Sequence, residues 1–160
     1  MQKRALVVSL ALTGLCGFAV VSAAAHEVKL PPGPIADRHD LMEGIGKSSK
    51  VINDAMKSGN FAPVGDAAEK IQAAAAKVTA LFPPGSTHAN SRAKPEIWTQ
   101  RAQFEGNVSA LAESFQKLSD IATTGNMQGF KTQFATVINA CFACHGGAAK
   151  SGGSFRAEIP

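Results

Sequence analysis

Two cysteines near the C-terminus, Cys141 and Cys144, are followed directly by a histidine, His145. Side chains three residues apart lie on the same face of a helix, so both thiols can reach one porphyrin ring and form thioethers with its vinyl groups. The adjacent histidine can then give the iron an imidazole nitrogen. The pattern therefore predicts one covalently attached haem c, with His145 as an iron ligand.

The same two cysteines without the histidine would fit a redox disulfide or half of a zinc site. A structural zinc ion needs about four protein ligands, and the only other cysteine is Cys16, which lies in an expected leader segment. A thioredoxin-like dithiol would need a strand before its helix, whereas the flanking sequence here has a helical pattern. Haem attachment is favoured, and a redox disulfide is the main alternative.

The first 25 residues have the features of a secretory signal peptide. Lys3 and Arg4 precede an apolar run over residues 5–21, and small residues follow at 22–25. We therefore expect removal of residues 1–25 and export of a cytochrome domain, residues 26–160, to the periplasm. A retained membrane anchor is the alternative, which the small residues of the cleavage site disfavour.

The formal net charge of the whole chain is +4, and removal of Lys3 and Arg4 lowers it to +2. A nearly neutral domain does not imply a nucleic-acid partner, and we expect no membrane insertion of the mature chain. About 135 residues can bury one hydrophobic core, so the sequence predicts a single domain.

Four segments show the apolar spacing of amphipathic helices, with glycine and proline at the joints. They cover about 35–57, 63–81, 95–118 and 127–144. Residues 83–94 form the one long loop, and a Gly/Ser-rich C-terminal tail is expected to be flexible. The short connections favour antiparallel neighbours. We therefore predict an all-α fold, an antiparallel up-down-up-down four-helix bundle with covalently bound haem.

The predicted topology selects candidates for the second axial ligand. The end of the fourth helix lies beside the start of the first, and Met42 is on the core face there. Met56 lies about 21 Å further along the first helix, so Met42 is the preferred sixth ligand. Two alternatives stay open: Met42 only fills space near the porphyrin, or parallel second and third helices bring Met56 to the haem. The remaining candidates are His26, His39, His88 and Met127.

Two arginines, Arg38 and Arg101, interrupt apolar stripes at the same end of the bundle. An unpaired buried guanidinium is costly, and pairing with a haem propionate would remove that cost. The alternative is that these side chains extend to solvent at the end of the bundle.

Three passages make the chain resemble the class II cytochromes c, the cytochrome c-prime family. The first is residues 38–42 (RHDLM), similar to the family's Arg-x-x-x-Met/Leu segment of helix one. The second is the proline-rich loop 82–86 (FPPGS) leading to 94–98 (KPEIW). The third is Cys141-x-x-Cys144-His145 near the C-terminus. The resemblance covers nearly the whole mature chain and implies a helix-one arginine, Arg38, near a haem propionate.

The family that the chain resembles contains two kinds of protein. High-spin cytochromes c-prime have five-coordinate iron and bind NO and CO, whereas low-spin members of the c-556 type use a helix-one methionine as sixth ligand and transfer electrons. Met42 falls on that ligand position by resemblance, although some five-coordinate members also carry methionine there. Family members are often dimers.

These considerations favour a periplasmic monohaem electron carrier of the c-556 type. His145 and Met42 would be the axial ligands, transient redox proteins the partners, and a homodimer is possible. We expect no enzymatic activity. The alternative is a five-coordinate cytochrome c-prime that binds NO or CO.

One departure from the family pattern concerns the C-terminal tail. The family usually continues His-x-x-Phe/Tyr-Arg, whereas here the nine residues 146–154 separate His145 from Phe155 and Arg156. This insertion leaves open whether Arg156 packs beside the haem.

Overall fold

The structure is a computed structural model that describes residues 30–147 and 152–157. The expected signal peptide, Cys16 and His26 lie outside the described residues. Within them, the helices are α1 (Pro34–Ser58), α2 (Val64–Val78), the 3₁₀ turn η1 (Thr79–Leu81), α3 (Glu96–Thr99), α4 (Arg101–Thr123) and α5 (Met127–His145).

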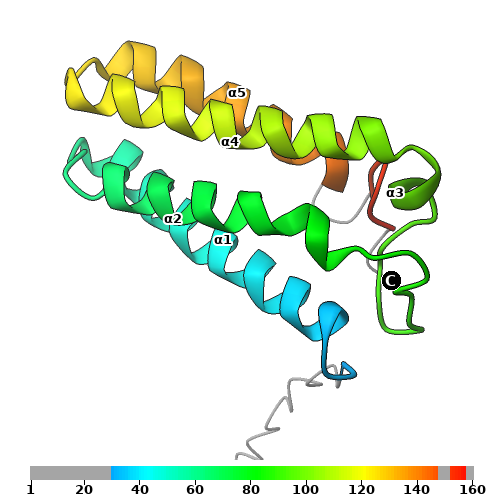
Figure 1. Ribbon diagram of the computed structural model, residues 1–160. Helices are drawn as coiled ribbons and strands as arrows, with labels where there is room; N and C mark the ends of the chain where they lie inside the picture. The colour runs from blue at the N-terminus through cyan, green and yellow to red at the C-terminus, as the bar shows by residue number, and fades with distance from the viewer. Residues whose placement is uncertain (1–29, 148–151, 158–160) are drawn as a thin grey trace, which may run out of the picture.

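The four long helices alternate in direction, so the prediction of an antiparallel up-down-up-down bundle is confirmed (Figure 1). Neighbours in the chain pack against each other: α1 on α2, α2 on α4, and α4 on α5. Contacts between α1 and α5 are sparse by comparison. None of the described helices has the length and apolar character needed to cross a membrane.

Local sequence signals set the ends of the helices. Pro34 occupies the first turn of α1, where its missing N–H is not needed. Gly59 ends α1 in the left-handed conformation, with φ of 73°, and its N–H donates to Ala55 O at 2.9 Å. The side chain of Asn126 caps α5 by accepting a hydrogen bond from the N–H of Gly129 at 2.9 Å.

The third predicted helix is divided in two, contrary to the single helix expected. Gln100, with φ of −118° and ψ of 46°, separates α3 from α4. Its N–H still donates to Glu96 O at 2.8 Å, and its carbonyl accepts from Phe104 N at 3.0 Å, so the bend leaves both groups paired. In α3, before the bend, the indole N–H of Trp98 donates to the carbonyls of Phe82 and Pro83 at 3.2 and 2.9 Å.

Two clusters of buried side chains make up the core. The larger one, here the main cluster, lies between the long helices and includes Ile52, Ile71, Phe115, Leu118 and Phe130. The smaller one, here the end cluster, consists of Val78, Phe82, Ile97, Phe104 and Phe155. The end cluster closes the bundle where α2 and α5 end and α4 begins, which is the end that carries the Cys-x-x-Cys-His motif (Figure 1).

Candidate haem-binding site

The two thiols of the motif lie in the last turns of α5. Both cysteines are free and half-buried. Burial raises the pKa of Cys141, and the neighbouring Cys144 raises it further. Burial also raises the pKa of Cys144, partly offset by the side-chain amide of Asn107, whose Nδ2 is 3.9 Å from Sγ. The two thiols lie one helical turn apart, and their burial favours the protonated form.

His145 is the last residue of α5 and is half-buried. Burial lowers its pKa, and the positive charges of Arg156 and Arg92 lower it further. The neutral imidazole is the form that binds a metal. The surroundings of His145 thus favour the protonation state that an iron ligand needs.

The end cluster places aromatic rings beside Cys144 at the end of α5. Phe82 and Phe155 both pack edge-on against Phe104, with ring centroids 5.1 and 5.4 Å away. Half-buried Trp98 and Cys144 also pack against the cluster. The thiol of Cys144 therefore adjoins an apolar, aromatic surface of the kind that accommodates a porphyrin.

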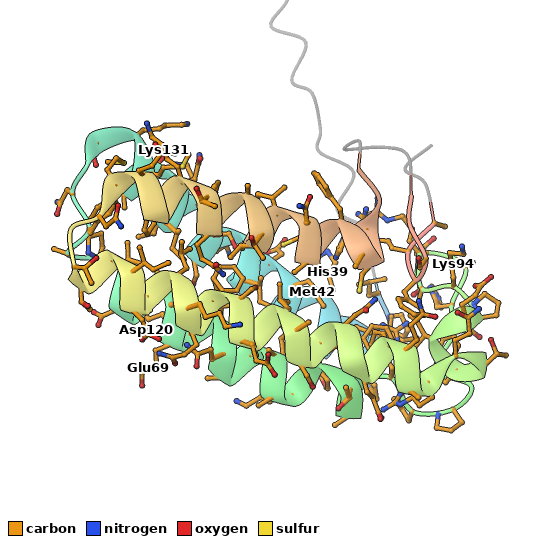
Figure 2. All side chains as sticks on the ribbon, turned by 90° about the horizontal axis from the view of Figure 1, so that it is seen from above. His39, Met42, Glu69, Lys94, Asp120 and Lys131 are labelled. Carbon is orange, nitrogen blue, oxygen red and sulfur yellow. The ribbon has the colours of Figure 1, made fainter. Side chains whose placement is uncertain are left out.

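Met42 lies at the expected end of the bundle. Its side chain is half-buried on α1 and packs against both the main and the end cluster (Figure 2). Met56 packs only against the main cluster, and Met127 lies near Gly59 at the opposite end. Because α2 and α4 are antiparallel, the alternative that would bring Met56 to the haem does not apply.

Arg38 is buried, with only 5% of its surface exposed, and its guanidinium is occupied by protein acceptors. Nη1 donates to Ser86 Oγ at 3.0 Å and to Leu81 O at 3.4 Å. Nη2 donates to Ser86 O at 2.9 Å and to Ser91 Oγ at 2.8 Å. The guanidinium also lies 4.5 Å above the ring of Phe82.

Arg101 also bonds main-chain carbonyls. Nη2 donates to Thr79 O at 2.8 Å and Nη1 to Phe82 O at 3.1 Å, while Nε donates to Glu105 at 2.7 Å. The burial cost that suggested propionate partners for Arg38 and Arg101 is thus already met by the end of η1 and by the loop after it. A propionate contact for either arginine stays a prediction.

Phe155 is a site residue for which the sequence carries only a weak signal. Its side chain is 2% exposed and completes the end cluster, so this residue of the C-terminal tail contacts the bundle. The pairing of Phe155 and Arg156 in the family pattern was the available signal, but nine residues separate His145 from Phe155 where the family usually has two, and this hid the contact.

The other predicted histidines lie away from this packing. His39 is exposed beside Asp40, and His88 is exposed in the loop, where its Nδ1 accepts from Asn90 N at 3.1 Å. In the described part of the chain, no group of three or more His, Cys, Asp or Glu side chains could hold a metal ion.

Two cysteines one turn apart, a histidine whose surroundings favour the neutral form and an aromatic cluster at the same end fit a covalently attached haem. When bound, the haem supplies an iron whose axial ligation decides between ligand binding and electron transfer. Fold and site together define a c-type cytochrome built on a four-helix bundle.

The comparison with known sequences identifies the family. The sequence model of the family described as "Cytochrome C'" matches residues 33–147, so the chain belongs to the cytochrome c' family. Members of that family carry a covalently attached haem c, which is therefore the cofactor of this chain. A cytochrome c' from Alcaligenes xylosoxydans xylosoxydans is 35% identical over 66 residues, 41% of this chain. The chain spans about half the length of that relative, 50%.

Solved structures of cytochromes c' share the fold. One, which shows an unusual ligand-controlled dimer dissociation, has a TM-score of 0.67 and 27% identity, covering 81% of this chain and 99% of that one. Cytochrome c' from Thermochromatium tepidum has a TM-score of 0.66 and 27% identity, covering 78% and 95%. A carbon monoxide-bound variant of the protein from Alcaligenes xylosoxidans has a TM-score of 0.65 and 23% identity, covering 78% and 94%.

These matches correct the expected function. The prediction of a low-spin electron carrier of the c-556 type, with iron held by both His145 and Met42, is wrong, because the family and its solved structures are cytochromes c'. The physical reason is that a methionine on the core face packs equally well with or without a bond to iron. The position of Met42 at the same end of the bundle as the motif therefore does not determine whether it binds the iron. His145 as an iron ligand stays a prediction.

Proposed function

We propose that this chain is a high-spin cytochrome c' that binds a small neutral gas, NO or CO, on the side of the haem opposite His145. The observation that carries the proposal is the family match over residues 33–147. A cytochrome c' of similar fold responds to a ligand by dimer dissociation, and another was solved with carbon monoxide bound.

The packing around Met42 supports a neutral ligand. The side chain contacts the end cluster, whose five members are all apolar, and its neighbour Leu41 packs against the same cluster. The two arginines nearest this packing already donate to protein carbonyls and hydroxyls. Apolar surroundings favour an uncharged diatomic molecule over an anion, because an anion would lose its hydration without gaining partners.

Met42 has a packing role in this proposal: it fills space beside the porphyrin. Binding of the gas, without catalytic turnover, is the proposed activity.

Transient redox proteins that supply single electrons remain part of the proposal, because CO binds the ferrous state of the haem. The proposed location is the periplasm, which the leader-like residues 1–25 favour.

Optical spectra of the purified holoprotein in both oxidation states test the proposal. We expect high-spin ferric and ferrous forms, and a ferrous spectrum that changes on addition of CO or NO. A low-spin ferrous spectrum that does not respond to CO would contradict it.

We also propose that the chain forms a homodimer whose stability depends on the haem ligand. The ligand-controlled dimer of a cytochrome c' that is 27% identical supports this. Val51 on α1 is 42% exposed and supplies apolar surface. Sedimentation velocity of the reduced protein with and without CO tests it: a monomer under both conditions, at concentrations up to the millimolar range, would contradict it.

A further inference from the structure

The tail segment 152–157, here called the strap, folds back onto the end of α5 (Figure 1, red). The main-chain N–H of Phe155 donates to the carbonyl oxygen of Cys144 at 3.3 Å, and Cys144 belongs to the haem-attachment motif. The side chain of Phe155 is buried against Phe104 in the end cluster. The strap therefore contacts both the main chain of the motif and the aromatic packing beside it.

A second set of bonds fixes the strap to the long loop. Lys94 N donates to Phe155 O at 3.1 Å and Ala157 N donates to Arg92 O at 2.9 Å, so Ala93 and Arg156 form an antiparallel bridge. The ammonium of Lys94 also donates to Gly153 O at 3.1 Å. Bonds from both the main chain and a side chain of the loop thus hold the strap in one place.

Gly153 packs so closely on the motif that no larger residue fits without movement. An added Cβ would collide with the carbonyl oxygen of Cys144 and the amide nitrogen of Gly146. These two atoms flank His145 in the chain. The backbone on both sides of His145 is thereby in van der Waals contact with the strap.

The part of the loop next to these residues is also anchored to α1. The hydroxyl of Ser91 accepts from Arg38, and Ser91 directly precedes the loop residues that pair with the strap. The position of the strap is therefore set by the bundle, through α1 and the loop, and not only by its own link to α5.

We propose that the strap positions His145: Phe155 and Gly153 are positioning residues that hold the end of α5, and with it the imidazole, against the haem. The inference rests on His145 being the iron ligand of the proposed cytochrome c'. Groups around a metal ligand set its orientation and basicity. Loss of the strap should therefore alter the iron–imidazole bond while the rest of the bundle stays folded.

The test uses the full-length holoprotein. The variants are Gly153→Ala, which adds the colliding Cβ, Phe155→Ala, which removes the anchor, and Phe155→Leu, which keeps an apolar anchor. Two matched controls are Gly147→Ala, since a Cβ there meets no atom within 4 Å, and Phe130→Ala, which removes a buried ring from the main cluster. The readouts are the iron–imidazole stretching band of the ferrous protein by resonance Raman and the midpoint potential.

We expect the band to shift or broaden, and the potential to change, in Gly153→Ala and Phe155→Ala. Phe155→Leu should recover most of the wild-type signal, and both controls should keep it. A wild-type band and potential in Gly153→Ala, together with wild-type values in Phe155→Ala wherever it folds, would overturn the proposal.

The wild-type spectrum separates this inference from the proposed function. An iron–imidazole band in the wild-type ferrous protein supports five-coordinate iron, whereas its absence with a low-spin spectrum contradicts the proposed function alone. In that second case the midpoint potentials of the variants still decide whether the strap acts on His145.

Discussion

Arg38 donates hydrogen bonds to both the hydroxyl and the main-chain carbonyl of Ser86, at 3.0 and 2.9 Å. The two residues are 48 positions apart, so one guanidinium on α1 holds the middle of the long loop. A further hydrogen bond, from Arg38 to Ser91, holds the part of the loop that precedes the residues paired with the strap. Arg38, which the sequence suggested as a propionate partner, thus holds the loop against α1.

Replacing Arg38 with methionine should lower the free energy of unfolding by about 3 kcal/mol. The change leaves Ser86 and Ser91 without their buried donor, and hydrogen bonds to a charged group each contribute about 1.5–3 kcal/mol. Urea unfolding of the holoprotein measures the loss. Exposed Lys47→Met, which removes only a surface ion pair with Glu43, is the control and should change stability by less than about 0.5 kcal/mol. An Arg38→Met variant as stable as this control would contradict the role of Arg38.

Much of the fold was predictable because its signals are local. Apolar side chains recur at helical spacing in each long helix, and glycine or proline marks the joints, as at Gly59. The haem motif was equally clear, since a thiol pair and an adjacent histidine define a site within five residues. Once the topology was assumed, the place of Met42 at the motif's end of the bundle followed from helix geometry alone.

The contacts that could not be predicted from the sequence join segments that lie far apart in the chain. The bend at Gln100 depends on tertiary packing and not on a helix-breaking residue. The partners of Arg38 lie in an irregular loop, whose course no periodicity describes. The burial of Phe155 depends on how residues 152–157 pair with the loop. The coordination of the iron was predicted wrongly for a different reason: the packing of Met42 does not specify whether its sulfur bonds the iron.

Replacing Arg101 with alanine should lower the free energy of unfolding by about 1–2 kcal/mol. The guanidinium bonds the carbonyls of Thr79 and Phe82 where the second helix ends, and an orphaned carbonyl regains only part of that energy from water. Glu105→Gln is the matched control, because it removes only the half-exposed ion pair with Arg101, and it should change stability by less than about 0.5 kcal/mol. Thermal unfolding measures both variants. If Arg101→Ala and Glu105→Gln lost the same free energy of unfolding, the hydrogen bonds to the two carbonyls would contribute nothing to stability.

Replacing Trp98 with phenylalanine should lower the free energy of unfolding by about 1 kcal/mol. The change keeps the aromatic packing on the end cluster but removes the indole donor to the carbonyls of Phe82 and Pro83. The haem absorption spectrum should not change, since the lost bonds lie in the loop. Guanidinium unfolding followed at the haem band measures both effects, and wild-type stability would argue against these two bonds.

Replacing either cysteine alone should leave haem attached through one thioether, and replacing both should abolish covalent attachment. Each thiol can react with only one vinyl group, so the remaining cysteine still forms its bond. The mass of the denatured chain reports this: Cys141→Ala and Cys144→Ala should carry the added mass of haem, and the double variant should not. Asn107→Ala, which removes the amide beside Cys144, is the control with both bonds intact. Covalent haem in the double variant would place the attachment elsewhere.

Replacing Met42 with alanine should leave the iron high-spin in both oxidation states and should strengthen CO binding. A side chain that fills space beside the porphyrin blocks an incoming ligand, so its removal opens room without changing the ligands of the iron. The buried methylene and sulfur atoms are also lost, which should lower stability by about 2–4 kcal/mol. Met56→Ala is the matched control, because Met56 packs only against the main cluster; it should cost similar stability without altering the CO titration of the ferrous protein. A low-spin wild-type spectrum that becomes high-spin only in Met42→Ala would instead identify Met42 as a ligand and contradict the proposed function.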